Sequence, residues 1–186
     1  MTETAIIKHC SPTLAGMKTG SMFTCPYQNK KDMCQTMRYW NSLLKEKGIR
    51  VIPLKYKDGT ALIYFYRIAK LSEDLKEQTA RQILEERGYE ISVPERCISK
   101  LMKRLVECDE FPHEIGLFLG YPPEDVCGFI ENGARNCKCV GCWKVYGDEQ
   151  KARDTFARYE KCTNAYSKQL AKGVSIEWPP STQKCA

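Results

Sequence analysis

Two β-rich runs separated by an Asp-Gly pair constrain the fold of this chain more than any other feature. Residues 50–56 (RVIPLKY) and 61–66 (ALIYFY) are rich in β-branched and aromatic side chains. Between them lie Asp58 and Gly59, which readily adopt the positive φ angles of a tight hairpin turn. The sequence therefore predicts an antiparallel hairpin over about residues 50–67.

Smaller strands complete the predicted sheet. Pro53 has no backbone N–H to donate, so we expect the first hairpin strand to lie at a sheet edge. Residues 142–146 are expected to form a third strand, and residues 174–178 could form a fourth. The N-terminal segment to about Lys30 is rich in Gly, Ser, Thr and Pro, so we expect mainly loops with one short helix there.

Helical patterns cover most of the remaining chain. Met33, Met37 and Trp40 share one helical face, and Gly48 follows as a stop signal. Ser72 and a Thr79/Gln82 capping box are expected to open two further helices. Proline and cap signals predict the remaining helices over residues 94–107, 112–119, 122–132 and 149–172, the last one capped by Asp148. Helices next to a small, mainly antiparallel sheet indicate the α+β class.

Length and composition fit a helix-rich single α+β domain. The chain has 186 residues, of which 42% are hydrophobic and 28% are charged, as in ordinary globular proteins. We expect one domain over residues 1–178 and a flexible tail over 179–186. No apolar run approaches the length of a membrane helix. Residues 1–7 lack the pattern of a signal peptide, so a cytoplasmic location is expected.

Charge and cysteine content narrow the class of function. The net charge of +6 is spread along the chain, so nucleic-acid binding is permitted but not indicated. The eleven cysteines are odd in number and no export signal accompanies them, so we expect reduced thiols. Such thiol richness is best tolerated where oxygen is scarce, which suggests an anaerobic source.

Three stretches together resemble a known family. They are HCSPTLAGMK at 9–18, FPHEIGLFLGYP at 111–122 and WKVY at 143–146, with YFYR at 64–67 between them. They resemble an uncharacterised family from anaerobic bacteria, domain of unknown function 3793, over nearly the whole chain. The resemblance implies one domain and an anaerobic source, and its association with flavodoxins implies a redox context. It implies no activity, cofactor or catalytic residue.

The segment from His9 to Ser21 is the first candidate site. Its glycines, hydroxyl groups and Lys18 have the composition of a loop that cradles an anion, although the spacing is not that of a Walker A loop. His9, Thr13 and Lys18 are candidate ligand-binding residues. Cys10 is a candidate nucleophile or soft ligand, because a neighbouring imidazolium could lower the pKa of its thiol. The alternative is a structured loop whose polar residues make turns.

The segment from Phe111 to Tyr121 is the second candidate site. Pro112 at the start of a helix would place His113 and Glu114 in the first turn, where a neutral imidazole could act as a base or ligand and Glu114 as a proton acceptor. Leu117 stands where a zinc protease would have its second histidine, so that chemistry is not expected. The alternative is a structural histidine and a carboxylate that stabilises the helix dipole.

The remaining candidates are cysteines and basic residues near the strands. Cys137, Cys139 and Cys142 could hold zinc or an iron–sulfur cluster, with Cys127 or Cys162 reaching them through folding; buried free thiols are the alternative. The Cys139–Cys142 spacing also occurs in thiol–disulfide redox motifs. Arg67 and Lys144 accompany strand aromatics that could stack a planar ligand such as a flavin, unless those aromatics form the core.

These observations lead to a principal hypothesis and two alternatives. The first is a cytosolic protein that binds a small anionic or planar ligand or cofactor and carries out thiol or redox chemistry, in a pocket shared by the His9–Lys18 and His113–Glu114 segments. The first alternative is a cysteine-metal-stabilised interaction module whose partner is an electron carrier such as a flavodoxin. The second is a non-specific nucleic-acid binder.

Overall fold

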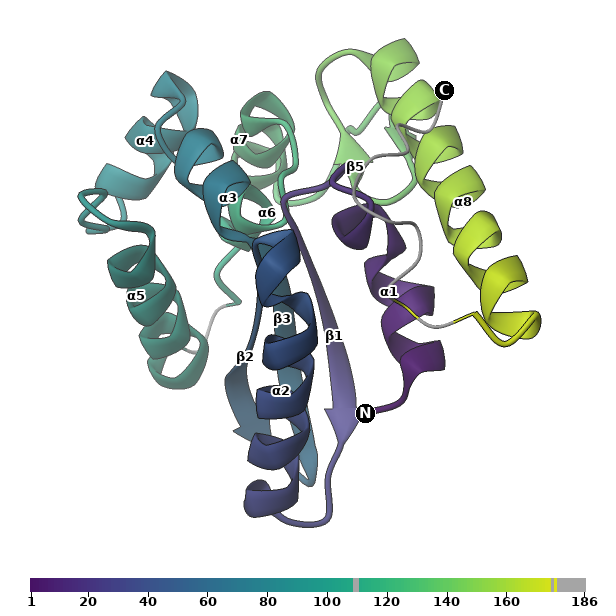
Figure 1. Cartoon of the computed structure of the whole chain (residues 1–186). Helices are drawn as coiled ribbons and strands as arrows, with labels where there is room; N and C mark the ends of the chain where they lie inside the picture. Colours follow the sequence, from purple (N-terminus) through teal and green to yellow (C-terminus); the bar gives the residue numbers. More distant parts are fainter. Residues whose placement is uncertain (109–110, 175, 177–186) are drawn as a thin grey trace. The chain divides into compact units, whose positions relative to one another are not determined.

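A computed structural model describes residues 1–108, 111–174 and 176 (Figure 1). These residues form two compact units. Unit 1 consists of Met1–Arg67 together with the described residues from Tyr159 onward, and unit 2 consists of the described residues within Ile68–Arg158. The fold is helix-rich α+β, as predicted. A single domain over residues 1–178 stays a prediction, and the predicted tail over 179–186 lies outside the described residues.

Unit 1 is built around a three-stranded antiparallel sheet. Its elements in chain order are α1 (Glu3–Leu14), β1 (Gly20–Pro26), α2 (Lys30–Leu44), the short 3-10 helix η1 (Lys45–Lys47), β2 (Ile49–Lys57) and β3 (Thr60–Arg67). The strand order is β1-β3-β2. Helix α1 packs against β1 and β3, and α2 packs against β2. Large side chains such as Ile63, Phe65 and Leu44 are fully buried in the resulting core.

The predicted hairpin is confirmed as β2 and β3. Lys57 pairs with Thr60, and the turn residues Asp58 and Gly59 have φ angles of 48° and 72°, as a tight hairpin turn requires. Pro53 lies in β2, which is an edge strand, so the position predicted from its missing N–H is also confirmed. The register shifts between Pro53 and Lys55, and this irregularity belongs to the same edge strand.

The N-terminal segment differs from the prediction of mainly loops. Helix α1 has twelve residues and contains Pro12, and its first turn is capped by the Thr2 hydroxyl. Strand β1 follows it, paired with β3 from Gly20 to Pro26. The sequence of β1 is poor in strand-forming residues, so its local propensity gave no signal. Pairing with the strongly β-forming β3 decides its conformation.

Unit 2 is mainly helical. It contains α3 (Ile68–Asp74), α4 (Gln78–Glu85), α5 (Pro94–Glu107), α6 (Ile115–Phe118) and α7 (Pro123–Glu131), followed by the two-stranded ladder of β4 (Cys139–Val140) and β5 (Lys144–Val145). Helix α8 (Glu149–Ala171) begins in unit 2 and ends in unit 1. None of the helices in the described parts of the chain is long and apolar enough to cross a membrane.

The predicted helix signals of unit 2 were partly right. Helices α5 and α7 begin at or next to the predicted prolines, and the Asp148 side chain accepts the Lys151 N–H at the start of α8 at 3.0 Å. Ser72 lies inside α3 instead of capping a helix. The cap of α4 is Glu77, whose carboxylate accepts the Ala80 N–H at 2.8 Å, so the predicted Thr79/Gln82 box was wrong.

The later strand predictions were confirmed only in part. β5 covers just Lys144–Val145 of the strand predicted over 142–146. The strand predicted over 174–178 lies partly outside the described residues, and neither Val174 nor Ile176 is in a strand.

Candidate functional site

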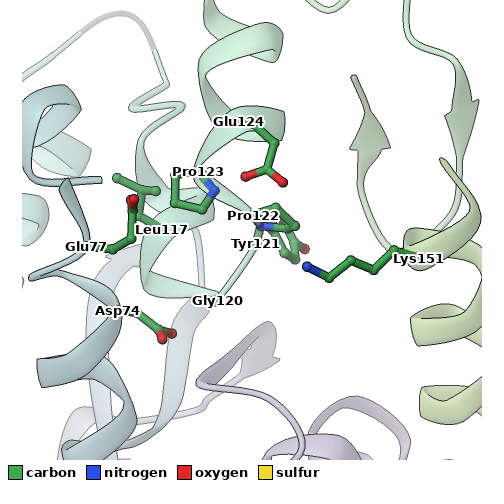
Figure 2. A pocket seen from close by; sticks show the side chains of 9 residues that line it. All are labelled: Asp74, Glu77, Leu117, Gly120, Tyr121, Pro122, Pro123, Glu124 and Lys151. Carbon is green, nitrogen blue, oxygen red and sulfur yellow. The ribbon is translucent and has the colours of Figure 1, made fainter. Parts of the chain in front are cut away.

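A pocket in unit 2 is the best candidate for a functional site (Figure 2). Its volume is about 280 Å³. Its walls come from the end of α3, the start of α4, the α6–α7 connection and the first turn of α8. The lining residues are Asp74, Glu77, Leu117, Gly120, Tyr121, Pro122, Pro123, Glu124 and Lys151. Four of them, Leu117 and Gly120 to Pro122, belong to the stretch over 111–122 that carries the family resemblance.

The wall at Tyr121 is held in place by the β4–β5 ladder. The Tyr121 hydroxyl donates a hydrogen bond to the Cys142 carbonyl oxygen at 3.1 Å. The Tyr121 ring stacks on Trp143 with ring centroids 5.0 Å apart. Gly120 has a φ of 72°, a conformation that favours glycine, and it ends α6 just before this wall. The ring therefore has a defined position at the pocket.

The ladder itself is anchored by a buried carboxylate. Asp125, in the first turn of α7, is 3% exposed. One of its oxygens accepts the Trp143 indole N–H at 2.6 Å. The other accepts the backbone N–H groups of Tyr146 and Gly147 at 2.6 and 2.7 Å. Asp125, the residue after the pocket residue Glu124, is thus fixed to the β4–β5 ladder and the segment that follows it.

Three carboxylates and one ammonium group line the pocket. Figure 2 shows Asp74 and Glu77 on one side of it and Lys151 on the other. Glu77 is oriented by its capping bond to Ala80. Glu124 packs beside Gly147, where a Cβ atom would lie 2.7 Å from Glu124 Cγ. The lining is therefore mixed in polarity, with apolar surface between charged groups.

The predicted residues around His9 lie in unit 1, mostly on α1. His9 is exposed, and its ring stacks on Phe23 with ring centroids 5.0 Å apart. Partial burial and the charge of Lys8 lower the pKa of His9. Cys10 is fully buried, and this burial raises the pKa of its thiol well above its ordinary value. That direction is opposite to the one required of an activated nucleophile.

Thr13 and Arg67 serve the packing of unit 1. The hydroxyl groups of Thr13 and Ser21 are hydrogen-bonded at 2.8 Å in the interior. The Arg67 guanidinium donates to the carbonyl oxygens of Thr13, Leu14 and Lys47 at 2.7, 2.6 and 2.9 Å. It therefore satisfies carbonyls at the ends of α1 and η1. Lys18 lies in the bend between α1 and β1.

The predicted residues His113, Glu114 and Lys144 lie in unit 2. Helix α6 begins at Ile115, later than predicted, so His113 and Glu114 precede it in a turn. The exposed His113 ring packs against Phe129 in an edge-to-face arrangement, with ring centroids 4.9 Å apart. Lys144 donates to the Ala134 carbonyl oxygen at 2.7 Å. The structure thus brings His113 and Lys144 to the same phenylalanine, since the Lys144 ammonium lies 6.0 Å from the Phe129 ring centroid.

Glu114 is the centre of a buried network. It is 1% exposed and accepts the Tyr89 hydroxyl at 2.8 Å. Arg104 Nε lies 2.6 Å from the same oxygen, as an ion pair whose N–H is not aligned for a hydrogen bond. Arg87 Nε lies 3.8 Å from the other oxygen. This arrangement ties the turn before α6 to α5 and to the segment after α4.

The predicted metal ligands lie along the β4–β5 ladder. Cys142 is exposed, and Cys137 and Cys139 are partly exposed. Within the described part of the chain, no three His, Cys, Asp or Glu side chains gather as they would around a metal ion. Cys127 donates to Glu131 at 3.2 Å, and Cys162 is buried in unit 1. The ten described cysteines form no disulfide with one another.

Comparison with known proteins identifies the family. The family model described as "Protein of unknown function (DUF3793)" matches residues 6–178. The chain belongs to this family. No curated protein and no solved structure matches it. Membership in DUF3793 confirms the resemblance seen in the sequence and adds no activity to it.

Sequence reasoning missed most of the pocket. Asp74, Glu77, Glu124 and Lys151 are single charged residues in ordinary amphipathic helices or their caps, and nothing in their spacing marks them. The only available signal was the stretch that ends in Gly120, Tyr121 and Pro122. The sequence pattern favoured His113 and Glu114 of this stretch as functional residues, whereas its last residues, Gly120 to Pro122, line the pocket.

Proposed function

We propose that this DUF3793 protein binds a small organic molecule in the pocket of unit 2. The observation that carries this proposal is the combination of a hollow of about 280 Å³ with a wall that the β4–β5 ladder holds in place. A volume of this order suits a small metabolite better than a large cofactor. The proposal retains the ligand-binding part of the hypothesis drawn from the sequence and moves it to a different set of residues.

Pre-organisation supports the proposal. Tyr121 is fixed by the Cys142 carbonyl and by Trp143, and Glu77 is fixed by its capping bond. A ligand that enters such a pocket loses its own freedom but orders few protein side chains, which favours affinity. The apolar surface of Leu117, Pro122 and Pro123 offers area that a ligand can cover.

A fragment screen with a matched pair of variants tests this function. Small molecules of varied charge would be added to isotope-labelled protein, and the amide resonances of Gly120, Tyr121 and Lys151 would be followed. We expect at least one compound to shift these resonances in a saturable way. Lys151→Trp, at an exposed pocket position, should abolish the shifts, whereas Lys161→Trp on the exposed part of the same helix should not. Shifts that survive Lys151→Trp would contradict the proposal.

The other expectations from the sequence remain proposals. They are a cytoplasmic location, an anaerobic source, thiol or redox chemistry, and an electron-carrier partner. The exposed Cys142 and partly exposed Cys137 and Cys139 are the best support for thiol chemistry, because buried Cys10 is poorly suited to it. Mass spectrometry after controlled oxidation would test the proposed thiol chemistry. We expect a disulfide within residues 137–142, and its absence would contradict thiol chemistry at these cysteines.

A further inference from the structure

We propose that the outer face of α2 binds single-stranded nucleic acid. This inference concerns unit 1 and does not depend on the pocket of unit 2. It goes beyond the non-specific nucleic-acid binder considered from the sequence, because it names the binding face and the form of the nucleic acid. The reasons are the unequal charge of the two units, a row of basic side chains on α2 and an exposed tyrosine beside that row.

Basic charge is concentrated in unit 1 when the residues are sorted by unit. Residues 1–67, the larger stretch of unit 1, contain 11 Lys and Arg and 4 Asp and Glu, a net charge of +7. Residues 68–158, the stretch of unit 2, contain 14 Lys and Arg and 17 Asp and Glu, a net charge of −3. A positive field of this kind around one unit attracts a polyanion such as nucleic acid.

Three basic side chains form a row along the outer face of α2. Lys31, Arg38 and Lys45 are exposed and follow one another at intervals of seven residues, which is nearly two helical turns, or about 10 Å. None of the three side chains is paired with another described residue. Because about 10 Å is also the Debye length at 0.1 M salt, the fields of neighbouring charges overlap, and a phosphate backbone can lie along the row.

The acidic residues of α2 and η1 lie near the ends of this row. Asp32 is in the first turn of α2, where its carboxylate accepts the Asn29 amide and the helix dipole stabilises its charge. Glu46 lies beyond the end of α2, in η1. Residues 33–45 contain no Asp or Glu. The positive potential along the middle of the helix is therefore not neutralised by its own residues.

An exposed aromatic ring beside the row favours single strands. Tyr39 follows Arg38 on α2 and is 58% exposed. Its ring meets the buried Trp40 edge to face, with ring centroids 5.3 Å apart, which restricts its orientation. Unpaired bases stack on exposed aromatic rings of this kind, whereas the bases of a duplex are already stacked. A protein partner would need a broader apolar patch at the centre of its interface, and Tyr39 alone does not provide one.

Fluorescence anisotropy with a labelled oligothymidylate of about twelve nucleotides tests the inference. The single strand, its duplex with oligoadenylate and polyglutamate of equal charge would be titrated at several salt concentrations. We expect the single strand to bind most tightly and its affinity to fall steeply with salt. Polyglutamate that binds as tightly would overturn the inference in favour of an acidic protein partner, and a duplex that binds more tightly would overturn it as well.

A triple variant with a matched control locates the site. Replacing Lys31, Arg38 and Lys45 together by Gln should weaken the single strand about 30-fold and reduce the slope of log K against log salt by about 2. The control makes the same charge change at three exposed positions of α8 in unit 1, namely Lys161→Gln, Lys168→Gln and Lys172→Gln. It should weaken binding by no more than about threefold. Equal losses in both variants would overturn α2 as the binding face.

Tyr39→Ala separates stacking from charge. It should weaken the single strand about tenfold and leave the salt dependence unchanged, because stacking releases no counterions. Phe111→Ala removes a similarly exposed ring from unit 2 and should have no effect. Unchanged affinity in Tyr39→Ala, or no binding by the wild type at low salt, would overturn the inference. Neither result bears on the proposed pocket, whose ligands are detected by separate resonances in unit 2.

Discussion

Asp125 and Trp143 are joined by a hydrogen bond of 2.6 Å from the indole N–H to a buried carboxylate oxygen. Through this bond α7 holds the strand ladder that supports Tyr121. The carboxylate also accepts two backbone N–H groups, so three donors depend on one side chain. A substitution that removes the charge of Asp125 or one of its two acceptor oxygens leaves at least one of these buried N–H donors without a carboxylate oxygen to bond.

Asp125→Asn should therefore destabilise the protein by about 3 kcal/mol, because the amide nitrogen replaces an acceptor next to buried donors. Denaturant unfolding measures this change. The indole N–H resonance of Trp143 should exchange with solvent faster in the variant. Asp154→Asn, at an exposed position that accepts a hydrogen bond from the exposed Gln150, is the control and should have little effect.

Glu114→Gln should also be strongly destabilising. The substitution leaves Arg104 and Arg87 beside a neutral group in a buried network, and breaking such a network costs about 3 kcal/mol. Glu107→Gln, whose partner Lys103 is exposed, should change stability little. If Glu114→Gln were as stable as the wild type, the network would have no structural role and the predicted role of Glu114 as a proton acceptor would deserve a direct test.

Arg67→Lys should destabilise unit 1 although it preserves the charge. One ammonium group cannot reproduce the three hydrogen bonds that the guanidinium donates to separate carbonyls, so we expect a loss of about 2 kcal/mol. Thermal unfolding provides the measurement. Arg50→Lys, on an exposed position of β2, is the matched control, and similar losses in both variants would count against the role of Arg67 as a helix-end partner.

The Cys10 thiol should make stability decline at alkaline pH. Burial raises the pKa of Cys10 in the folded state, so the thiol ionises first in the unfolded chain. Its contribution is complete below the unfolded pKa of about 8.5 and is lost above it, by up to about 1.4 kcal/mol per pH unit.

Unfolding free energies measured from pH 7 to pH 10 test this. The decline should be shallower in Cys10→Ala than in the wild type. Cys108→Ala removes an exposed thiol and is the control that should keep the wild-type decline. A Cys10→Ala slope equal to that of the wild type would show that other groups determine the decline.

Gly128→Ala should be destabilising although alanine is the better helix former. In α7 the added Cβ atom would lie 2.5 Å from Cγ of Tyr146, so Tyr146 or the helix must shift. Three Tyr146 atoms lie within 3.1 Å of the added Cβ atom, so we expect an overpacking cost in the upper part of the usual range, about 2–3 kcal/mol, which exceeds the gain in helix propensity of about 1 kcal/mol. Chemical unfolding gives the sign directly, and a stabilised variant would mean that Tyr146 moves freely.

Local signals explain which parts of the fold could be predicted. The β2–β3 hairpin, α5, α7 and the Asp148 cap carry their information in adjacent residues, such as Asp58 with Gly59. Strand β1 and the cap of α4 have no such signal in adjacent residues. The conformation of β1 depends on β3 at a distant position, and Glu77 is an uncommon capping residue.

The residues of the candidate site were harder to predict from the sequence than the elements of the fold. Chemistry-bearing residues such as Cys10 and Arg67 stand out in the sequence, but whether they are buried or already hydrogen-bonded is decided by tertiary packing. The carboxylates of the pocket are the opposite case. Asp74 and Glu124 are unremarkable in sequence, and only the meeting of α3 and α7 in unit 2 places them at one pocket.

The division of unit 1 between two stretches of the chain has a consequence for biosynthesis. Residues 68–158 of unit 2 are contiguous, so they leave the ribosome together and can fold as they emerge. The core of unit 1 also contains Cys162 and Tyr166, which are translated after all of unit 2. Its sheet and α1 must therefore wait with an incomplete apolar surface for the time taken to synthesise about ninety residues, a period in which chaperones have access to it.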